Sequence, residues 1–481
     1  MIATILTILK KILPKITPTD RVFYKNKLYG LACNRRFWIF FLFEYSFCRF
    51  TFLTFYPKEL EKKQRICYNN HETAKKAIHA KVFMKRLSDY LTHKKDEELS
   101  ELTPIFQSEI VANATEFYDR VNVSAKRMFG FPAYHAPLSL ATQYLLLLHY
   151  TAPLSNNCGD VDERGNYAMD SKEIEKRIVK IFADKFGMGD EFWGYITSGG
   201  SESNSCGIDL AFAQNPNGIL YYSKAAHYSI QKHGRYYACE EIPVIHGDEM
   251  DLNVLFERIL HNYQQKGAAA NLMLTHGTTQ YGACDDVDAI VAFLKANNIP
   301  YYIHLDAALY GGIPNNQTDA PIFTNGKARG INSISVSLHK YLGFPAVKSV
   351  FVATQKPNGQ KISYIGQHDT TISGSRSVSG YALYNHILEQ YGNPAPDLYS
   401  QNILFLENLL TERKIPFYRA PKANIFVIDA PSERTCQKFQ LSCFDVTEQG
   451  KNRKKAHIIV FPSHEKEHIR RLTDYLAEDL L

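Results

Sequence analysis

The sequence predicts an α/β protein with a mostly parallel central sheet, followed by a small α+β domain at the C-terminus. Between about residues 193 and 354, short β-branched or aromatic runs alternate with helix-compatible stretches, which is the pattern of parallel strands covered by helices. The 481 residues, 45% of them hydrophobic, can bury a large core and form two or three domains. Ligands of such sheets lie at strand ends, where the candidate residues described below fall.

The same patterns divide the chain into four parts. We expect an atypical leader in residues 1–60, an N-terminal arm in 61–190, a large α/β domain in 191–394 and a small C-terminal domain in 395–481. No internal repeat or low-complexity tract crosses these boundaries.

The leader is unusually apolar. Apolar residues from Ile2 to Ile16 share one helical face with lysines around it, and residues 37–56 form an aromatic-rich run broken by Glu44 and Arg49. This run is long enough to span a membrane, but its two central charges make a span costly. A membrane-surface or anchoring segment is one interpretation; we favour leader sequence from an upstream start codon, or an arm that packs on a dimer partner. Internal lysines and the lack of a small-residue cleavage pattern argue against a secretory signal.

One helix is predicted near the end of the arm. Apolar residues at helical spacing from Ile174 to Phe186 form a stripe that we expect to face the core. Asp170 or Ser171 can cap the start of this helix, and Gly187 can end it.

The large and small domains contain further segments with helix or strand patterns. Residues 285–297 have the pattern of a helix within the large domain. After Pro394, residues 398–410 resemble a helix, and residues 423–428 and 456–461 resemble strands, so we expect a compact α+β domain there.

Charge and cysteine usage restrict the class of protein. The net charge of +6 is modest for this length, and without a basic arm it gives no reason to expect nucleic-acid binding. No zinc-ligand spacing is present, so no metal site is predicted. The nine cysteines are scattered and form no CxxC pair, which favours reduced thiols and a cytoplasmic enzyme.

A glycine-rich turn follows the strand-like run of residues 194–197. Ser198-Gly199-Gly200-Ser201-Glu202 then leads into a helix-compatible run from Ser203 to Phe212. Glycines let the backbone approach a phosphate, Ser201 offers a hydroxyl in the first helical turn, and exposed helix amides favour negative charge. The turn therefore predicts an anion cup with Gly200 and Ser201 at its centre.

Three further residues follow strand-like runs in a chemically suggestive order. His227 comes after an apolar run, Asp306 ends the run of residues 301–305, and Lys340 closes the β-like run Ser337-Leu338-His339-Lys340. A lysine and a carboxylate so placed suit pyridoxal phosphate: the amine would hold the cofactor as a Schiff base, and the carboxylate would keep the pyridine nitrogen protonated. An imidazole between them in chain order could stack on a planar ring.

With these residues, the chain resembles the group II pyridoxal-phosphate-dependent amino-acid decarboxylases, closest to the branch of bacterial histidine decarboxylases and plant serine decarboxylases. The resemblance covers roughly residues 128–475 and implies the fold type I architecture of pyridoxal-phosphate transferases. The matching strings are NNCGD (156–160), WGYITSGGSESN (193–204), LYYSKAAHYSI (220–230), GTTQYGACDD (277–286), HLDAALYG (304–311), SVSLHK (335–340) and HDTTISGSR (368–376).

The resemblance assigns roles to the candidate residues. Lys340 matches the Schiff-base lysine, Asp306 the partner of the pyridine nitrogen, and His227 the histidine that stacks on the cofactor and faces the substrate. It also implies a homodimer with each active site at the subunit boundary, and residues 127–132 resemble the substrate-side loop. The other matches are Gly200, Ser201, Ser337 and His339 near the phosphate, and Thr279 and Ala308 lining the ring.

The expected reaction is decarboxylation of an amino acid, with histidine as first candidate and serine as second. Residues 368–369 and 431–434 look more like the histidine enzymes, whereas residues 439–443 and 456–460 look more like the serine enzymes. Both branches continue the GSR motif with Asn-Gly-His, but this chain has Ser377-Val378-Ser379, so another amino-acid substrate stays open. The donor of the proton that replaces carbon dioxide also stays open among His227, Lys340 and a tyrosine.

Two alternative functions belong to other classes of protein. An enzyme like sphingosine-phosphate lyase would share the TSGGSE cup and an N-terminal membrane segment, but the strings NNCGD and HYSI argue against it. A catalytically inactive scaffold would keep the fold for partner binding. The intact set of Lys340, Asp306 and His227 argues against that loss of chemistry.

Overall fold

The computed structural model describes most of the chain from residue 156 onward. The predicted leader (1–60) and most of the predicted arm (61–190) lie outside the described residues. In the part of the chain that the structure describes, no helix is long and apolar enough to cross a membrane. The described residues are 127–132, 156–167, 169–317, 319–377, 383–384, 386–388, 391, 399–448 and 451–480.

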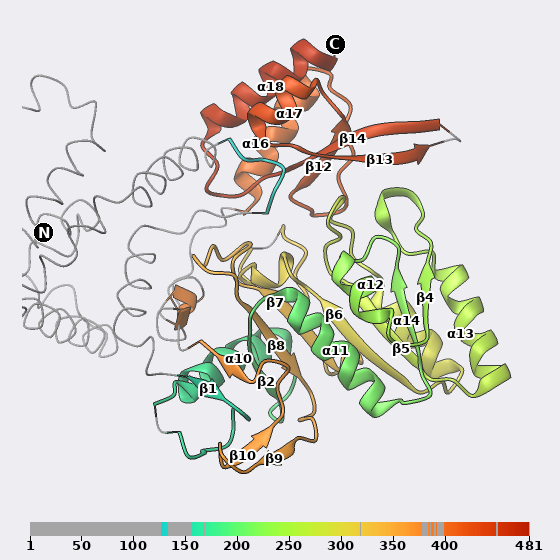
Figure 1. Cartoon of the computed structure of the whole chain (residues 1–481). Helices are drawn as coiled ribbons and strands as arrows, with labels where there is room; N and C mark the ends of the chain where they lie inside the picture. The colour runs from blue at the N-terminus through green and yellow to red at the C-terminus, as the bar shows by residue number, and fades with distance from the viewer. Residues whose placement is uncertain are drawn as a thin grey trace, which may run out of the picture. The chain divides into compact units, whose positions relative to one another are not determined.

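A seven-stranded sheet in the order β2-β8-β7-β6-β5-β3-β4 lies at the centre of the large domain (Figure 1). All adjacent pairs are parallel except those formed by β8, which runs antiparallel to β2 and β7. The predicted sheet is therefore confirmed, with one antiparallel strand that the sequence pattern did not indicate. The strands are β2 (Trp193–Thr197), β3 (Ile219–Ser223), β4 (Cys239–Ile242), β5 (Ala270–Thr275), β6 (Tyr301–Asp306), β7 (Ser333–Ser337) and β8 (Ser349–Ala353).

Helices cover both faces of this sheet. Successive residues of a strand point to opposite faces, so both faces carry apolar side chains that helices bury. On β3, Tyr221 belongs to the main core, whereas Leu220 and Tyr222 pack with Ile208 and Ile230 on the other face. The first face is covered by α10 (Lys172–Phe186), α13 (Leu252–Lys266) and α14 (Val287–Ala296), and the second by α11 (Gly200–Gln214) and α12 (Tyr228–Gly234).

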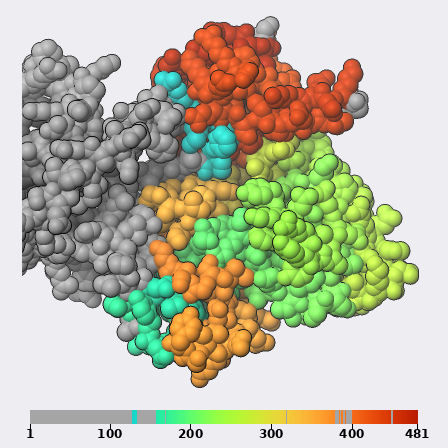
Figure 2. Space-filling view, viewed as in Figure 1, coloured from blue at the N-terminus to red at the C-terminus, as the bar shows by residue number. Residues whose placement is uncertain are grey.

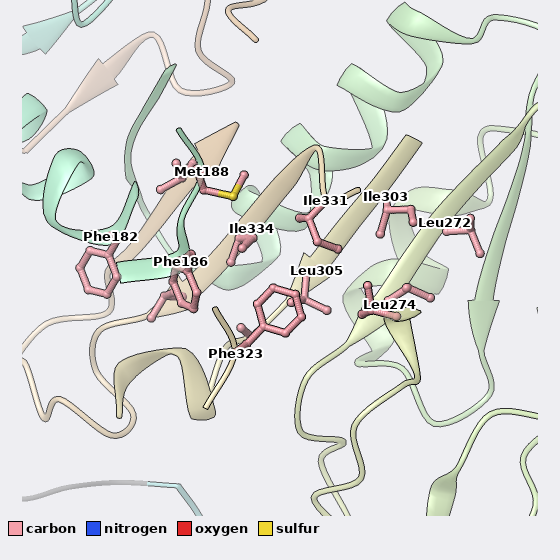
Figure 3. Packing of buried hydrophobic residues seen from close by; sticks show 14 of the residues in the cluster. Phe182, Phe186, Met188, Leu272, Leu274, Ile303, Leu305, Phe323, Ile331 and Ile334 are labelled. Atoms are coloured by element: carbon pink, nitrogen blue, oxygen red, sulfur yellow. The ribbon is translucent and has the colours of Figure 1, made fainter. Parts of the chain in front are cut away.

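Helix α10 shows how the predicted stripe is used. Its residues Ile178, Phe182 and Phe186 are almost completely buried in the main core, where they lie near the side chains of the central strands (Figure 3). The helix ends at Gly187, which has φ 63°, a left-handed conformation that glycine adopts without strain. This apolar face is used within its own chain, so it is not available to a second subunit.

The C-terminal residues form a three-stranded antiparallel sheet packed with three helices, as the predicted α+β pattern requires. Leu406, Phe426 and Leu472 lie in the core that they share. The strand of residues 442–448 and the helices of residues 433–439 and 466–480 were not among the elements expected from the sequence. The elements are α16 (Tyr399–Glu412), β12 (Ile425–Asp429), α17 (Glu433–Phe439), β13 (Ser442–Glu448), β14 (Lys451–Ile459) and α18 (Lys466–Leu480).

The short segment 127–132 packs on this C-terminal sheet (Figure 2). Phe129 is fully buried, with its ring 4.4 Å from that of His464, and its carbonyl accepts a hydrogen bond from the backbone N–H of Ile459. A Cβ on Gly130 would approach the carbonyl oxygen of Gln440 to 2.2 Å, so this close approach needs a glycine. The neighbouring Phe131 is exposed.

A buried ion pair joins the motif strings NNCGD and GSR. The Arg376 guanidinium contacts both carboxylate oxygens of Glu175, at 2.8 and 3.1 Å, and Glu175 also accepts from the backbone N–H of Ile196 and the Asn157 amide. The two short strands beside this pair, β1 and β11, are antiparallel. These motifs therefore fasten three distant segments together. The remaining small elements are β1 (Asn157–Cys158), β9 (Gln360–Ile362), β10 (Gln367–Asp369), β11 (Ser375–Arg376), η2 (His246–Asp248) and η3 (Tyr310–Gly312).

Candidate active site

The candidate residues gather at one edge of the sheet. Since β2, β3, β5, β6 and β7 run in the same direction, their carboxyl ends meet at this edge. Each of these strands is followed by, or ends in, at least one predicted residue. In the strand order just given, these are Gly200 and Ser201; His227; Thr279; Asp306 and Ala308; and Ser337, His339 and Lys340.

Lys340 lies in a tight turn directly after β7. Its backbone carbonyl accepts from the N–H of Gly343, and the Phe344 N–H bonds back to the Leu338 carbonyl, which closes the turn. Burial lowers the pKa of the Lys340 amine, and the negative charge of Asp306 opposes this shift. In the described part of the chain, no hydrogen bond or ion pair engages the amine. A neutral, unengaged amine is a nucleophile.

Asp306 is held at the end of β6 by neighbouring polar groups. Its carboxylate accepts 2.8 Å from the Asn204 side-chain amide and 3.1 Å from the backbone N–H of Ala308. The side chain is only 5% exposed, so its charge acts in a medium of low polarity. The same position lets it act electrostatically on Lys340 and His227.

His227 precedes the short helix α12 and acts as its cap. Its Nδ1 lies 2.8 Å from the Ser229 hydroxyl and 3.3 Å from the Ser229 backbone N–H. Burial lowers the pKa of this imidazole; Asp306 acts in the opposite direction, and Lys340 lowers it further. The ring is half-buried and lies 4.3 Å from that of the exposed Tyr228.

The turn for which we predict an anion cup lies where β2 passes into α11. A Cβ on Gly200 would come within 3.1 Å of the Ser337 hydroxyl, which in turn accepts from Ser349 at 3.3 Å. Glycine therefore brings the start of α11 close to hydroxyl groups from two other strands. Backbone amides at a helix start, next to hydroxyl donors, fit a phosphate group. The donor set, with an amine and a carboxylate at the same sheet edge, fits pyridoxal phosphate as a whole.

The remaining predicted residues differ in how directly they meet this cluster. The carbonyl of Ala308 accepts from the Ser337 backbone N–H at 3.1 Å, which joins the ends of β6 and β7. His339 is instead engaged by the Lys348 carbonyl, 3.2 Å from its Nδ1. Thr279 is exposed on the turn after β5. Across the described residues, neither Ser201 nor Thr279 makes a side-chain hydrogen bond.

Several buried polar residues behind the cluster were missed by the sequence reasoning. Asn204 connects Asp306, Ser229 and His304, and Ser335 also bonds to it. Asn204 lies within a motif string that was recognised, but it was read only as part of the helix after the cup. Its position one helical turn beyond Gly200, on a helix that must pack on the sheet, could have indicated a group facing the strand ends.

The fold and the site define a pyridoxal-phosphate-dependent enzyme, and the comparisons narrow this class. A family model described as the pyridoxal-dependent decarboxylase conserved domain matches residues 211–370. Histidine decarboxylase of Pseudomonas entomophila is 33% identical over 345 residues, which cover 68% of this chain and 80% of that protein. Serine decarboxylase 2 of Oryza sativa is 33% identical over 362 residues, covering 72% of this chain and 74% of that protein. The chain belongs to the pyridoxal-dependent decarboxylase family.

Solved structures agree on the fold. L-methionine decarboxylase from Streptomyces sp. 590 superposes with a TM-score of 0.66 at 21% identity, over 77% of this chain and 95% of that one. A structure of Oryza sativa TDC with PLP and tryptamine gives a TM-score of 0.59 at 15% identity, over 85% and 99%. These structures confirm the predicted fold type I class. The family match and the relatives above confirm the pyridoxal phosphate cofactor and the assignment as a carboxy-lyase.

Proposed function

We propose that this amino-acid decarboxylase converts L-histidine to histamine and carbon dioxide, with Lys340, Asp306 and His227 as its catalytic residues. The observation that carries the site is the meeting of all three at the carboxyl edge of the sheet, where Asp306 raises the pKa of both His227 and Lys340, and Lys340 lowers that of His227. Perturbed titratable groups that converge on one site mark places where protons and charge are handled.

Each residue has a role that follows from its surroundings. Pyridoxal phosphate, when bound, supplies a conjugated ring that accepts the electrons left when carbon dioxide departs. The Lys340 amine would hold the cofactor covalently, and its lowered pKa favours the neutral form in which an amine is a nucleophile. The buried Asp306 carboxylate would hold the protonated ring nitrogen, and the His227 imidazole would pack on the ring.

Binding of the phosphate is assigned to the cup. We place it against the backbone amides at the start of α11, with Gly200, Ser201 and Ser337 next to it. His339 contributes through its backbone, since its ring is engaged by Lys348. Thr279 and Ala308, which follow β5 and β6, would border the ring.

The preference for histidine rests on relatives that cover most of the chain. Histidine decarboxylases of Pseudomonas entomophila and Acinetobacter baumannii are 33% and 32% identical, over 68% and 72% of this chain. The rice serine decarboxylase is as similar, so serine is the second candidate substrate. Residues 377–379, where this chain departs from both branches, are the first place to look for a difference in specificity.

An amino-acid panel tests reaction and substrate together. Carbon dioxide release is measured with each standard amino acid, and the amine product is identified by mass spectrometry, with the Lys340→Ala variant as the control for background. We expect histidine to react fastest and serine next. Release from another amino acid would overturn the substrate and keep the reaction, whereas cleavage of phosphorylated sphingoid bases without any decarboxylation would overturn both.

The assembly and location of the enzyme complete the proposal. We propose a cytoplasmic homodimer, divided into leader, arm, large domain and small domain at the boundaries given above, with a leader that is dispensable for catalysis. Deletion of residues 1–60 should leave an active dimer, whereas deletion to about residue 135 removes Phe129 and its contacts with Phe439 and Ile459 and should be much worse. The oligomeric state of both deletion variants is measured by sedimentation, and their activity by carbon dioxide release. Loss of the dimer in the shorter deletion would make the leader a structural part of the enzyme.

A further inference from the structure

Asn204 uses every hydrogen-bonding position of its side chain beneath the candidate site. Its Nδ2 donates to the Asp306 carboxylate at 2.8 Å and to the Ser229 hydroxyl at 3.0 Å. Its Oδ1 accepts from His304 at 3.1 Å and from the Ser335 hydroxyl at 3.1 Å. Asn204 is 1% exposed, so water does not compete for these bonds.

The orientation of this amide is fixed by Asp306, because a carboxylate only accepts hydrogen bonds and must face the NH₂ group of Asn204. Burial lowers the pKa of His304 to about 4, so its ring carries one proton at neutral pH. The Nε2 atom faces Asn204, and the Nδ1 atom lies 2.8 Å from the Ser333 hydroxyl, which can donate to it. Since the NH₂ group of Asn204 faces Asp306 and Ser229, its oxygen faces His304, and the proton of His304 must lie on Nε2.

The same network reaches His227 through Ser229. The Ser229 hydroxyl accepts from Asn204, which leaves its own proton free to donate to Nδ1 of His227. The backbone N–H of Ser229 points at the same Nδ1 atom. A backbone N–H can only donate, so a proton on Nδ1 would face a second donor. His227 is therefore favoured as the neutral ring with its proton on Nε2.

We infer that Asn204 is a positioning residue, which orients the Asp306 carboxylate directly and, through Ser229, holds His227 as a neutral imidazole that carries its proton on Nε2. The inference rests on the proposed function, because it assigns this work to residues of that site. It identifies Asn204 and Ser229 as residues that act on the site through their hydrogen bonds to Asp306 and His227.

The held tautomer limits what His227 can do in the reaction. A neutral ring can donate a hydrogen bond from Nε2, but transfer of that proton to carbon would leave an imidazolate, a far stronger base. His227 therefore orients and stabilises charge, and the proton that replaces carbon dioxide comes from another group. The charged groups that act on His227 are Asp306 on β6 and Lys340 after β7, and their effects on its charge oppose each other.

Nuclear magnetic resonance of the full-length holoenzyme, labelled with ¹³C and ¹⁵N in histidine, tests the tautomer directly. The His227 signal is assigned by its loss in His227→Gln. We expect a neutral ring with the proton on Nε2 near pH 7, whether or not substrate is present. A proton on Nδ1, an equal mixture of tautomers, or an imidazolium at that pH would overturn the inference.

Ser229→Ala removes one of the two donors to Nδ1 and keeps the backbone one. The neutral ring then loses stabilisation, so the pKa of His227 should rise, and the acidic limb of the kcat/KM profile should move to higher pH. Ser223→Ala is the matched control, because Ser223 is also a buried serine near the end of β3 but bonds only to the backbone N–H of Ala225. An acidic limb that stays in place in Ser229→Ala would contradict the link to His227, as would activity that instead requires protonated His227.

Asn204→Leu removes the hydrogen bonds of the Asn204 side chain and keeps a side chain of similar size. We expect affinity for pyridoxal phosphate to fall about 10-fold to 100-fold, as for loss of a hydrogen bond to a charged group. Circular dichroism identifies a misfolded variant, in which case Asn204→Ser provides the same comparison with a smaller polar group. Unchanged cofactor affinity and an unchanged His227 tautomer in a folded variant would remove Asn204 from this role. If no amino acid is decarboxylated, the proposed function fails, while the resonance and cofactor measurements still decide this inference.

Discussion

Two buried charged clusters in this protein come from equally specific sequence motifs, yet their chemistry differs. At the NNCGD and GSR motifs, the Arg376 guanidinium bonds to both oxygens of Glu175, to the Gly159 carbonyl and to the Thr371 hydroxyl. At the carboxyl edge of the sheet, the Lys340 amine is engaged by no hydrogen bond or ion pair from the described residues. The pKa of Arg376 is raised overall, whereas that of Lys340 is lowered by burial.

The difference separates a structural cluster from a reactive one. A charged group whose bonding positions are all used holds segments together and has nothing left to offer a ligand. A half-buried amine without such partners, such as that of Lys340, adds little to stability and stays open to a ligand. The state of the hydrogen bonds, rather than the specificity of the motif, therefore indicates which cluster performs chemistry.

Removal of the Lys340 amine should have the largest effect on activity. We expect Lys340→Ala to lower turnover by about 1,000-fold or more, equivalent to about 4 kcal/mol of transition-state stabilisation. Its thermal stability should change little, because the half-buried amine that is removed makes no hydrogen bond or ion pair with the described residues. Carbon dioxide release and thermal unfolding are measured on the same preparation, and near-normal turnover would remove Lys340 from the catalytic role.

Loss of Arg376 should affect stability instead. Arg376→Ala leaves Glu175 buried without its partner and should lower the free energy of unfolding by about 3–5 kcal/mol, seen as a lower urea midpoint. The matched control is Arg329→Ala at the exposed pair with Asp288, where the expected change is below about 1 kcal/mol. A stable Arg376→Ala enzyme that has lost turnover would reverse the assignment of the two clusters.

The carboxylate of Asp306 should matter for the reaction more than for the fold. Asp306→Asn should slow decarboxylation by at least about 100-fold, or about 2.7 kcal/mol, because a neutral amide does not hold a ring nitrogen protonated. Asp285→Asn is the control, since burial raises the pKa of this nearby carboxyl to about 7 and its oxygen accepts only from backbone. Lower stability with normal turnover in Asp306→Asn would show a capping carboxylate rather than a catalytic one.

Mild acid should lower the free energy of unfolding through two buried histidines before it weakens the ion pair of Arg376 and Glu175. Burial lowers the pKa values of His276 and His304 to about 4, so from pH 6.5 downward the unfolded chain binds protons that the folded chain does not. Between pH 6.5 and 5.5 the free energy of unfolding should fall by about 1 kcal/mol for each histidine. In urea titrations at several pH values, His276→Gln should reduce the pH dependence of the free energy of unfolding by the part that is due to His276. An unchanged pH dependence would mean that His276 is protonated in the folded state.

Much of the fold could be predicted because its signals are local. The start and end of α10 follow from Asp170, which accepts from the Lys172 N–H, and from Gly187 in its left-handed conformation. The run Tyr301–Asp306 is a strand with the expected end. By contrast, β8 has the same kind of apolar sequence as its parallel neighbours, and its antiparallel direction depends on the path of the chain between strands, which no local pattern encodes.

The candidate site, like the fold, could be predicted only where its signal is local in the sequence. Lys340, Asp306 and His227 could be named because each follows a strand and carries a reactive group. Asn204 and Ser229 could not, because their importance lies in contacts between residues 25 and 102 positions apart in the sequence. The direction in which His339 faces depends likewise on the carbonyl of Lys348, which only the folded chain brings near.

Chemical trapping tests the central claim most directly. The holoenzyme is reduced with borohydride, digested, and its peptides are sequenced by mass spectrometry to find the lysine that carries the phosphopyridoxyl group. We expect the label on Lys340 and none in Lys340→Ala, with Lys348→Ala, a nearby lysine whose pKa burial also lowers, labelled as the unaltered enzyme is. A label on another lysine, or on none, would contradict the assignment of the active site to this edge of the sheet.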